Sequence, residues 1–313
     1  MYSIKNNKGK RIWKELKQNY ALLLMLLPGF VALALFAYKP IYGLLIVFKD
    51  YKFRLGVWGS PWADKYGMEH FFKLFGGSDF PRVLKNSITI SLLKLLFGFP
   101  APIILALMLN ELHNKFFKRT VQTLTYLPYF FSWVVLGGIF KMLFSAVGPV
   151  NMILSQIGVE EPILFFGSNT PFLILIIISS IWQSVGWSAV IYMAALSGVD
   201  ESLYEAAYID GVTLWKRIWN IDIPAIMGTV TTVFIMNLGS VLEAGFDQIY
   251  NMYNAMVYSS ADILDTYSLR LLQGGRYEIG TALGIFKSLV GLIFILAANK
   301  LIKKISDNEY GII

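Results

Sequence analysis

Cysteine is absent from this 313-residue chain, and histidine occurs only twice. Without cysteine, the chain cannot form disulfides, thiolate metal sites or cysteine nucleophiles. The two histidines, His70 and His113, lie far apart in polar segments, so we expect no histidine-based metal site. Charged residues are also scarce, at 15% of the chain, compared with about a quarter in soluble domains.

Hydrophobic residues take the place of the missing charges. They make up 56% of the sequence and gather in long runs. Such runs predict an all-α, polytopic membrane protein. The formal net charge of +7 comes from basic residues dispersed at the ends of these runs, a pattern typical of membrane orientation. We therefore expect membrane lipid around the chain and no nucleic-acid partner.

Six apolar runs predict six transmembrane helices. The first covers residues 21–48 and is interpreted as an uncleaved helix, because it continues past the small residues at 32–34 that resemble a signal-peptide cleavage site. The other five spans are predicted at 88–109, 124–144, 172–196, 224–242 and 279–301. This assignment divides the chain into a basic amino terminus (1–20), the first helix (21–48), an extracytoplasmic loop (49–83), a five-helix core (84–302) and a tail (303–313).

The distribution of basic residues predicts the orientation. Lysine and arginine are concentrated before the first span, between the second and third spans, and after the sixth. The segment after the third span has none, and the segment after the fifth has only Arg270 and Arg276. The positive-inside rule then places both termini, and the polar segment 199–224, in the cytoplasm. The loop 49–83 departs from this pattern, since it carries both basic and acidic residues.

The polar segment 199–224 lies between two apolar runs and predicts a helix, a glycine turn and a second helix. Asp200 or Ser202 can cap the first helix, and Ser202 with Glu205 has the spacing of a capping box. Gly211 supplies the left-handed turn that ends this helix.

Thr213 can cap the second helix, which carries Trp215, Ile218 and Trp219 on roughly one face. Pro224 suits the first turn of the next apolar helix. Apolar residues in a water-facing segment need a cover, which either a soluble partner or the membrane interface can provide.

The same segment resembles a known motif. Glu205-Ala206-Ala207, three residues, Gly211, nine residues and Ile221-Asp222-Ile223-Pro224 match the EAA motif of permease subunits of bacterial binding-protein-dependent ABC importers, with Ile223 in place of the usual leucine. The resemblance implies the architecture of a type I ABC importer permease and a segment that docks on a cytoplasmic ATPase. The residues to which it gives this coupling role are Glu205, Ala206, Ala207, Asp210, Gly211, Trp215, Lys216, Arg217 and Pro224.

Further stretches are similar to the branch of this family that imports complex oligosaccharides. They are Asn110-Glu111, Tyr126-Leu127-Pro128, 246–250 (FDQIY) and Asp265-Thr266-Tyr267, whereas Asn254-Ala255 replaces the Asn-Pro common in that branch. The resemblance implies a bacterial cell membrane, a second permease subunit, two ABC ATPase subunits and an extracellular sugar-binding lipoprotein. It also implies that ATP and Mg are used by the ATPase and that this chain binds no cofactor.

Polar residues in or near the spans are candidates for a substrate pathway. Lys94 and Lys287 are costly in a membrane helix and therefore predict a wet pathway or pairing with an acid, whereas Lys141 can snorkel from a helix end. Glu243 and Asp247 would share one face if the fifth helix continued that far, and could there meet the hydroxyls of a sugar. They could equally be outward loop charges or contacts with a partner. The remaining candidates are aromatic or amide side chains, which suit sugar rings but also serve as packing residues or interface anchors: Trp182, Gln183, Trp187, Tyr192 and Asn237.

No enzyme motif is present in the sequence. A P-loop and a nucleophile elbow are both absent, so we expect a transport subunit rather than an enzyme. Two alternatives stay open at this point. One is a membrane scaffold or sensor whose cytoplasmic segment docks a protein. The other is an ion-coupled secondary carrier that uses Lys94 or Lys287, although no inverted-repeat halves are visible.

Overall fold

The computed structural model describes residue 13 and residues 17–305. Most of the basic amino terminus and of the tail 303–313 therefore lies outside the described residues. The described part is helical, and its extended pairing is limited to an isolated bridge between Lys49 and Trp62. The all-α expectation is confirmed for this part of the chain.

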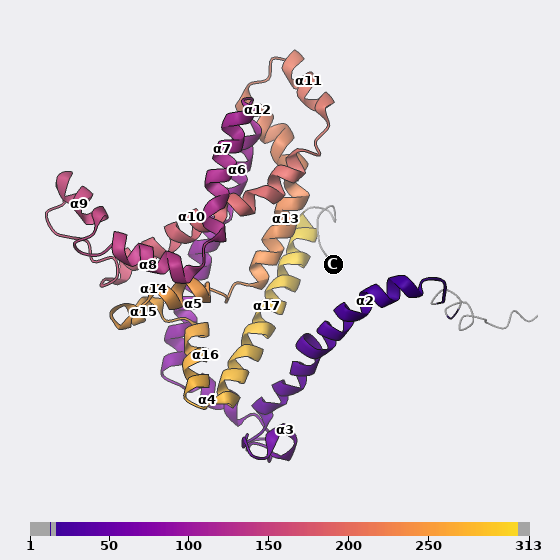
Figure 1. The fold of residues 1–313 in the computed structure, drawn as a ribbon, viewed down its shortest axis with the longest axis vertical. Helices are drawn as coiled ribbons and strands as arrows, with labels where there is room; N and C mark the ends of the chain where they lie inside the picture. Colours follow the sequence, from indigo (N-terminus) through magenta and orange to yellow (C-terminus); the bar gives the residue numbers. More distant parts are fainter. Residues whose placement is uncertain (1–12, 14–16, 306–313) are drawn as a thin grey trace, which may run out of the picture.

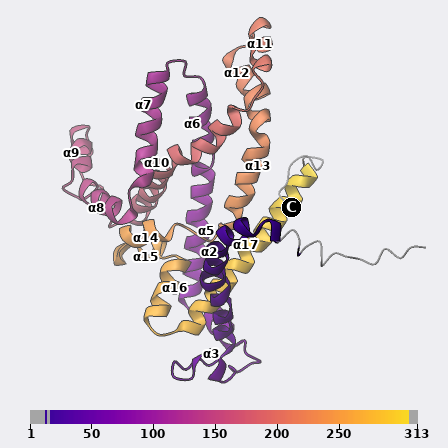
Figure 2. The ribbon, with the colours of Figure 1, turned by 45° about the vertical axis from the view of Figure 1, so that its right-hand side comes forward.

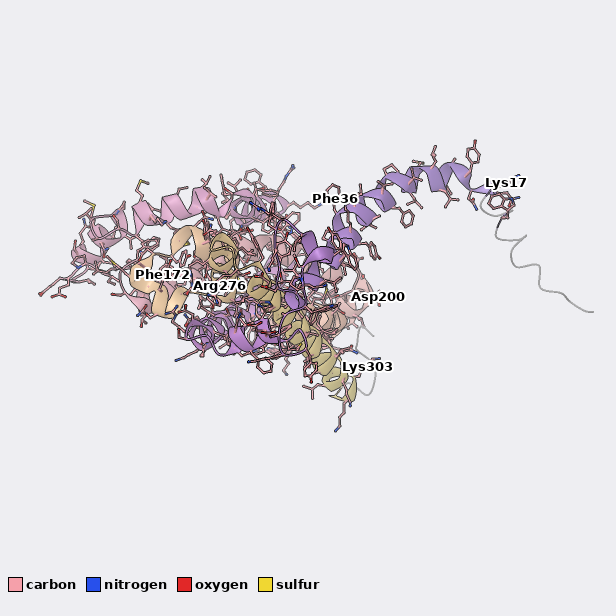
Figure 3. The ribbon with its side chains drawn as sticks, turned by 90° about the horizontal axis from the view of Figure 1, so that it is seen from below. Lys17, Phe36, Phe172, Asp200, Arg276 and Lys303 are labelled. Carbon is pink, nitrogen blue, oxygen red and sulfur yellow. The ribbon has the colours of Figure 1, made fainter. Side chains whose placement is uncertain are left out.

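The amino-terminal third begins with a long helix whose last part packs against α17 (Tyr277–Ile305). It consists of α2 (Tyr20–Leu33), a π-helical turn η1 (Ala34–Tyr38) and a 3-10 segment η2 (Lys39–Phe48). α2 has no buried residue and lies apart from the other helices (Figure 1; Figure 3, from Lys17 to Phe36). Its apolar surface must therefore be covered by lipid or by another subunit.

Two short helices and a long helical span in two parts follow. They are α3 (Gly56–Gly59), α4 (Glu69–Phe75), α5 (Asp79–Gly98) and α6 (Pro100–Asn110). α5 and α6 together form a span of 32 residues that begins at Asp79, nine residues before the predicted second span. The end of the predicted loop 49–83 is therefore helical.

The predicted third span at 124–144 is not one straight helix. The structure instead has α7 (Lys115–Tyr126) with a 3-10 turn η3 (Leu127–Phe130), and then α8 (Trp133–Leu143), bent by 101° from it. Phe131 between them is extended, and Ser132 caps α8 by accepting a hydrogen bond from the N–H of Val135. α8 therefore begins as a new helix, with its own capping residue, inside the apolar run. Because the run stays apolar across this point, hydrophobicity alone does not indicate the bend.

The second half contains the remaining helices. They are α9 (Pro149–Gln156), α10 (Asn169–Leu196), α11 (Glu201–Ile209), α12 (Leu214–Arg217), the π turn η4 (Ile218–Asp222), α13 (Ile223–Gly239), α14 (Phe246–Met252), η5 (Ala255–Val257), α15 (Tyr258–Ala261), α16 (Leu264–Gln273) and α17 (Tyr277–Ile305). Five helices in the described residues are long and apolar enough to cross a membrane, and the bent pair adds a sixth if it is one span.

α10 organises the packing of the core. It crosses the middle of the molecule beside α5, α6, α7 and α13 (Figures 1 and 2). Gly186 permits the closest of these crossings, because a side chain there would meet the backbone carbonyl of Thr125 on α7. Gly291 on α17 similarly lies against the backbone of Gly239 on α13. Small residues of this kind let membrane helices approach closely.

A buried carboxylate joins the helices at the end opposite α11. The side chain of Asp262 is fully buried and accepts two hydrogen bonds from Arg270, at 2.7 and 2.6 Å, and one from Arg82 on α5, at 3.1 Å. The hydrogen bonds to Asp262 raise the pKa of Arg270 above its ordinary value. This network fixes the start of α16 against α5.

Candidate functional site

The segment 199–224 forms the far end of the molecule, together with the α6–α7 connection (Figures 1 and 2). Asp200 caps α11 by accepting a hydrogen bond from the N–H of Ser202, so the capping residue is Asp200, and Ser202 lies in the first turn. Gly211 has a φ of +62°, which confirms the predicted left-handed turn. The turn reverses the chain between α11 and α12.

The second half of the segment differs from the prediction of a separate helix. α12, η4 and α13 form one continuous helix, Leu214–Gly239, and Pro224 lies within it. A π turn widens the backbone over the five residues before α13, where a proline would otherwise clash with the preceding turn. The exposed residues of α12 are therefore continuous with a helix that is long and apolar enough to cross a membrane.

Most of the predicted coupling residues face outward. Glu205, Ala206, Asp210, Gly211, Trp215, Lys216 and Pro224 are exposed, Arg217 is half-buried and Ala207 is buried. The rings of Trp215 and Trp219 lie 6.4 Å apart and are 70% and 57% exposed. Tyr208 and Ile209 on α11 are more exposed still. An apolar surface of this kind on a polar segment fits a docking face.

A hydrogen bond joins the two limbs of the segment, α11 before the turn at Gly211 and α12 with η4 after it. Asp222 is fully buried, and its Oδ1 accepts a hydrogen bond of 2.6 Å from the hydroxyl of Tyr204 on α11. Burial, and then the hydrogen bond to Asp222, raise the pKa of Tyr204 to about 12, so the phenol remains a donor at ordinary pH. The first limb is therefore fixed to the base of α13.

Arg217 connects the segment to the rest of the same end. Its guanidinium forms an ion pair with Glu111, at the end of α6, and its Nε lies 3.8 Å from Oδ2 of Asp222. The guanidinium also lies over the ring of Tyr204, at 5.2 Å. Tyr204, Asp222, Arg217 and Glu111 therefore form one cluster, which we call the limb-tie cluster.

A first cavity, of about 600 Å³, lies among α5, the start of α6, α10, α13 and the residues that follow α13. Four of the predicted pathway residues line it: Lys94, Tyr192, Asn237 and Glu243. Hydroxyl groups add to its polar wall, from Ser91, Ser180, Ser184, Ser188 and Ser240. Its volume is in the range of small-molecule sites.

A second cavity, of about 450 Å³, lies among α13, α16 and α17. Lys287 lines it and forms an ion pair with Asp265, which fulfils the expectation that this lysine pairs with an acid. Glu243 lines both cavities, and it is the predicted pathway residue that they share.

The structure does not bring the other predicted pathway residues to these cavities. Trp187 stacks on Tyr129, with centroids 5.0 Å apart, and Gln183 donates to the carbonyl of the same tyrosine. Trp182 packs edge-on against Phe140 of α8. These three side chains brace α10 against the bent pair, which is the packing role that a span aromatic usually has.

Asp247 is also displaced from its predicted partner. α13 ends at Gly239, and the chain breaks at Gly245, with a φ of +90°, before α14 begins. The condition for Glu243 and Asp247 to share one helix face, a fifth helix that continues to Asp247, is therefore not met. In the described residues, no group of three or more His, Cys, Asp or Glu side chains is placed to hold a metal ion.

Sequence reasoning missed three residues of these sites. Asp222 stands at a variable position of the motif, although an acid at the start of an apolar helix is a signal of function. Tyr204 and Gln248 had no such signal, because their partners lie 18 to 154 residues away in the sequence.

Comparison with known proteins agrees with the motif. Residues 98–307 match the family described as "Binding-protein-dependent transport system inner membrane component". Protein LplB of Bacillus subtilis (strain 168) is 40% identical over 95% of this chain and 93% of its own length. The polygalacturonan/rhamnogalacturonan transport system permease protein YteP of the same organism is 40% identical over 97% of this chain and 94% of its own.

A solved structure extends the agreement to the fold. A bacterial ABC transporter involved in the import of the acidic polysaccharide alginate has a chain that is 40% identical and superimposes with a TM-score of 0.86, covering 94% of this chain and 99% of that one. A second structure of such a transporter, in complex with an alginate pentasaccharide-bound periplasmic protein, is 39% identical, again with a TM-score of 0.86, over 96% and 100%. This chain is thus a membrane-embedded transport subunit and belongs to the family of binding-protein-dependent transport system inner membrane components.

Proposed function

We propose that this chain is a permease subunit of an ABC importer that moves an oligosaccharide, delivered by an extracellular binding protein, across a bacterial cell membrane. The observation that carries the proposal is the continuous helix Leu214–Gly239, because it connects an exposed motif segment to a span that lines both cavities. Movement of the segment then changes the walls of the cavities.

The proposed partners are inferred from the missing P-loop and from the exposed apolar surfaces of the chain. It has no P-loop, so a pair of separate ATPase subunits must bind and hydrolyse ATP with Mg. The surface of Tyr208, Ile209 and Trp215 is the docking face for one of them. The bare helix α2 and the open cavities leave room for a second permease subunit. This arrangement requires segment 199–224, and both chain termini, to be cytoplasmic.

The cycle uses alternating access. Closure of the ATPase dimer on ATP moves α11 and α12, and the limb-tie cluster transmits this movement to α13 and to the α6–α7 connection. The cavities then open toward the binding protein. One relative is named for the transport of polygalacturonan or rhamnogalacturonan, and a similar solved transporter imports alginate, which supports an oligosaccharide as cargo.

The test is substrate-dependent ATP hydrolysis. The chain is reconstituted in lipid with its second permease, ATPase and binding protein, and ATP hydrolysis and uptake are measured with and without oligosaccharides. We expect stimulation of wild type, and loss of stimulation with normal membrane insertion in Glu205→Lys and Gly211→Asp. The control is Glu160→Lys, an equal charge reversal at an exposed position after α9. Assembly without any oligosaccharide-dependent hydrolysis would favour the scaffold alternative.

A further inference from the structure

Lys94 is an intramembrane lysine whose hydrogen-bond partners are neutral. Its Nζ donates hydrogen bonds to the carbonyl of Ala244, at 2.7 Å, and to Oε1 of Gln248, at 2.5 Å. None of the ion pairs in the described part of the chain includes Lys94. This distinguishes it from Lys287, which is paired with Asp265. A charge without a counter-ion is costly in a membrane span, so its retention calls for a function.

The surroundings hold the amine in place. Gln248 is 2% exposed and donates through Nε2 to the carbonyl of Ile176 and to the hydroxyl of Ser179. These two bonds fix the orientation of its amide, so that Oε1 faces the lysine. A side-chain carbon at Gly245 would lie 2.6 Å from Nζ, so the glycine keeps space for the amine. The ammonium is thus positioned by the fold rather than free to snorkel.

Hydrogen-bonding capacity remains for a ligand. An ammonium has three N–H donors, and two of those on Lys94 are used. Ser91 lies three residues earlier on the same face of α5 and lines the same cavity, and its buried hydroxyl has no hydrogen-bond partner among the described residues. A charged donor and an unsatisfied hydroxyl therefore lie at the wall of one cavity.

The rest of the cavity wall suits a sugar. Ser180, Ser184 and Ser188 recur at four-residue intervals on α10 and place a row of hydroxyls along one face. Apolar and aromatic side chains line the same cavity, including those of Phe99 and Tyr192. Sugar rings present both hydroxyls and apolar faces, and therefore match a wall of this composition.

From these observations we infer that the cavity binds an anionic oligosaccharide, one that contains uronate units, and that Lys94 with Ser91 holds a carboxylate of the sugar. The inference rests on the proposed function and narrows its substrate class. The ligand carboxylate supplies the counter-ion that the described chain lacks. Glu243 is the acidic residue that lines this cavity in the described part of the chain, and it also reaches the second cavity, where Lys287 lies.

The experiment measures ATP hydrolysis by the full reconstituted importer at saturating binding protein, titrated with a galacturonate trisaccharide and, separately, with a neutral trisaccharide. Lys94→Gln removes the charge, Lys94→Arg retains it, and Lys85→Gln is the matched control at an exposed position of the same helix. Yield of the assembled complex and unstimulated hydrolysis are recorded for each variant, because a merely structural role of Lys94 would change those values.

We expect Lys94→Gln to raise the half-maximal concentration of the uronate by about tenfold or more, the usual loss for one charge-assisted hydrogen bond. Lys94→Arg and Lys85→Gln stay within about threefold of wild type, and Glu243→Gln leaves the value unchanged or lowers it.

Three results would overturn the inference. They are an unchanged uronate response in Lys94→Gln, an equal loss for the neutral sugar, and stimulation of wild type by the neutral sugar alone; in each case the proposed importer function stands. If no oligosaccharide stimulates wild type, the proposed function fails, and the inference fails with it.

Discussion

The limb-tie cluster makes a quantitative prediction for Tyr204→Phe. The substitution removes the hydroxyl that donates to Asp222 at 2.6 Å. Asp222 is fully buried, its Oδ2 has no hydrogen-bond partner in the described residues, and Arg217 Nε is 3.8 Å away. Loss of the hydroxyl therefore leaves a buried carboxylate without its hydrogen bond, which costs about 1.5–3 kcal/mol.

This cost has a direct effect on coupling. A loss of about 1.5–3 kcal/mol lowers the ratio of tied to untied limbs by roughly 10-fold to 150-fold. When the limbs are untied, movement of α11 no longer drives α13. We therefore expect Tyr204→Phe to hydrolyse ATP with the ATPase still docked, but to transport fewer substrate molecules per ATP.

The assay is uptake per ATP hydrolysed in proteoliposomes, with the unfolding temperature of the complex measured in parallel. Tyr66→Phe is the control, because it removes a hydroxyl from an exposed tyrosine in the loop 49–83, outside segment 199–224. Asp222→Asn retains an acceptor for Tyr204 and is expected to lose less coupling than Tyr204→Phe. Wild-type stoichiometry and wild-type unfolding temperature in Tyr204→Phe would refute the reasoning.

Three other predictions concern glycine positions and pH. Gly211→Ala costs about 1–2 kcal/mol, because alanine is strained at a φ of +62°, and we expect it to reduce coupling without loss of assembly. Its control, Gly29→Ala, retains full coupling, because the added side-chain carbon meets nothing within 4 Å. Gly186→Ala forces a side chain into the backbone of α7 and lowers the yield of folded complex, whereas Gly138→Ala, also with open space, leaves the yield unchanged in a detergent-solubility assay. The pKa of Tyr204 is raised from 10.0 to about 12, so its contribution to stability is fully present below pH 10 and is lost as the pH rises through 12. The difference in unfolding temperature between wild type and Tyr204→Phe should therefore stay constant from pH 6 to 9. A decline in that range would contradict the raised pKa of Tyr204.

Local signals in the sequence were sufficient for most of the spans and for the turn in segment 199–224. Long apolar runs define α10 and α17, and the glycine at position 211 marks the reversal between α11 and α12. Both signals depend on residues within one or two helical turns. Contacts with distant parts of the chain therefore do not change the structure that these signals predict.

The remaining features depend on longer-range contacts. The bend before α8 falls within an apolar run, where a buried helix and a broken one have the same composition. The continuity of α12 with α13 depends on a π turn that accommodates Pro224 and has no sequence pattern of its own. The position of Lys94 depends on Gln248, 154 residues later, so its cavity could be inferred only from the structure.

Cross-linking from the turn in segment 199–224 tests directly whether this segment docks on an ATPase subunit. The chain has no cysteine, so Asp210→Cys provides a single thiol at an exposed position between the two limbs. A maleimide photo-cross-linker on this thiol is activated in the assembled importer, with and without ATP. The account predicts a covalent adduct with the ATPase subunit whose yield changes with ATP, and protection of the thiol from impermeant reagents added outside intact cells. Labelling of the thiol from outside, or an adduct with the extracellular binding protein, would contradict the account.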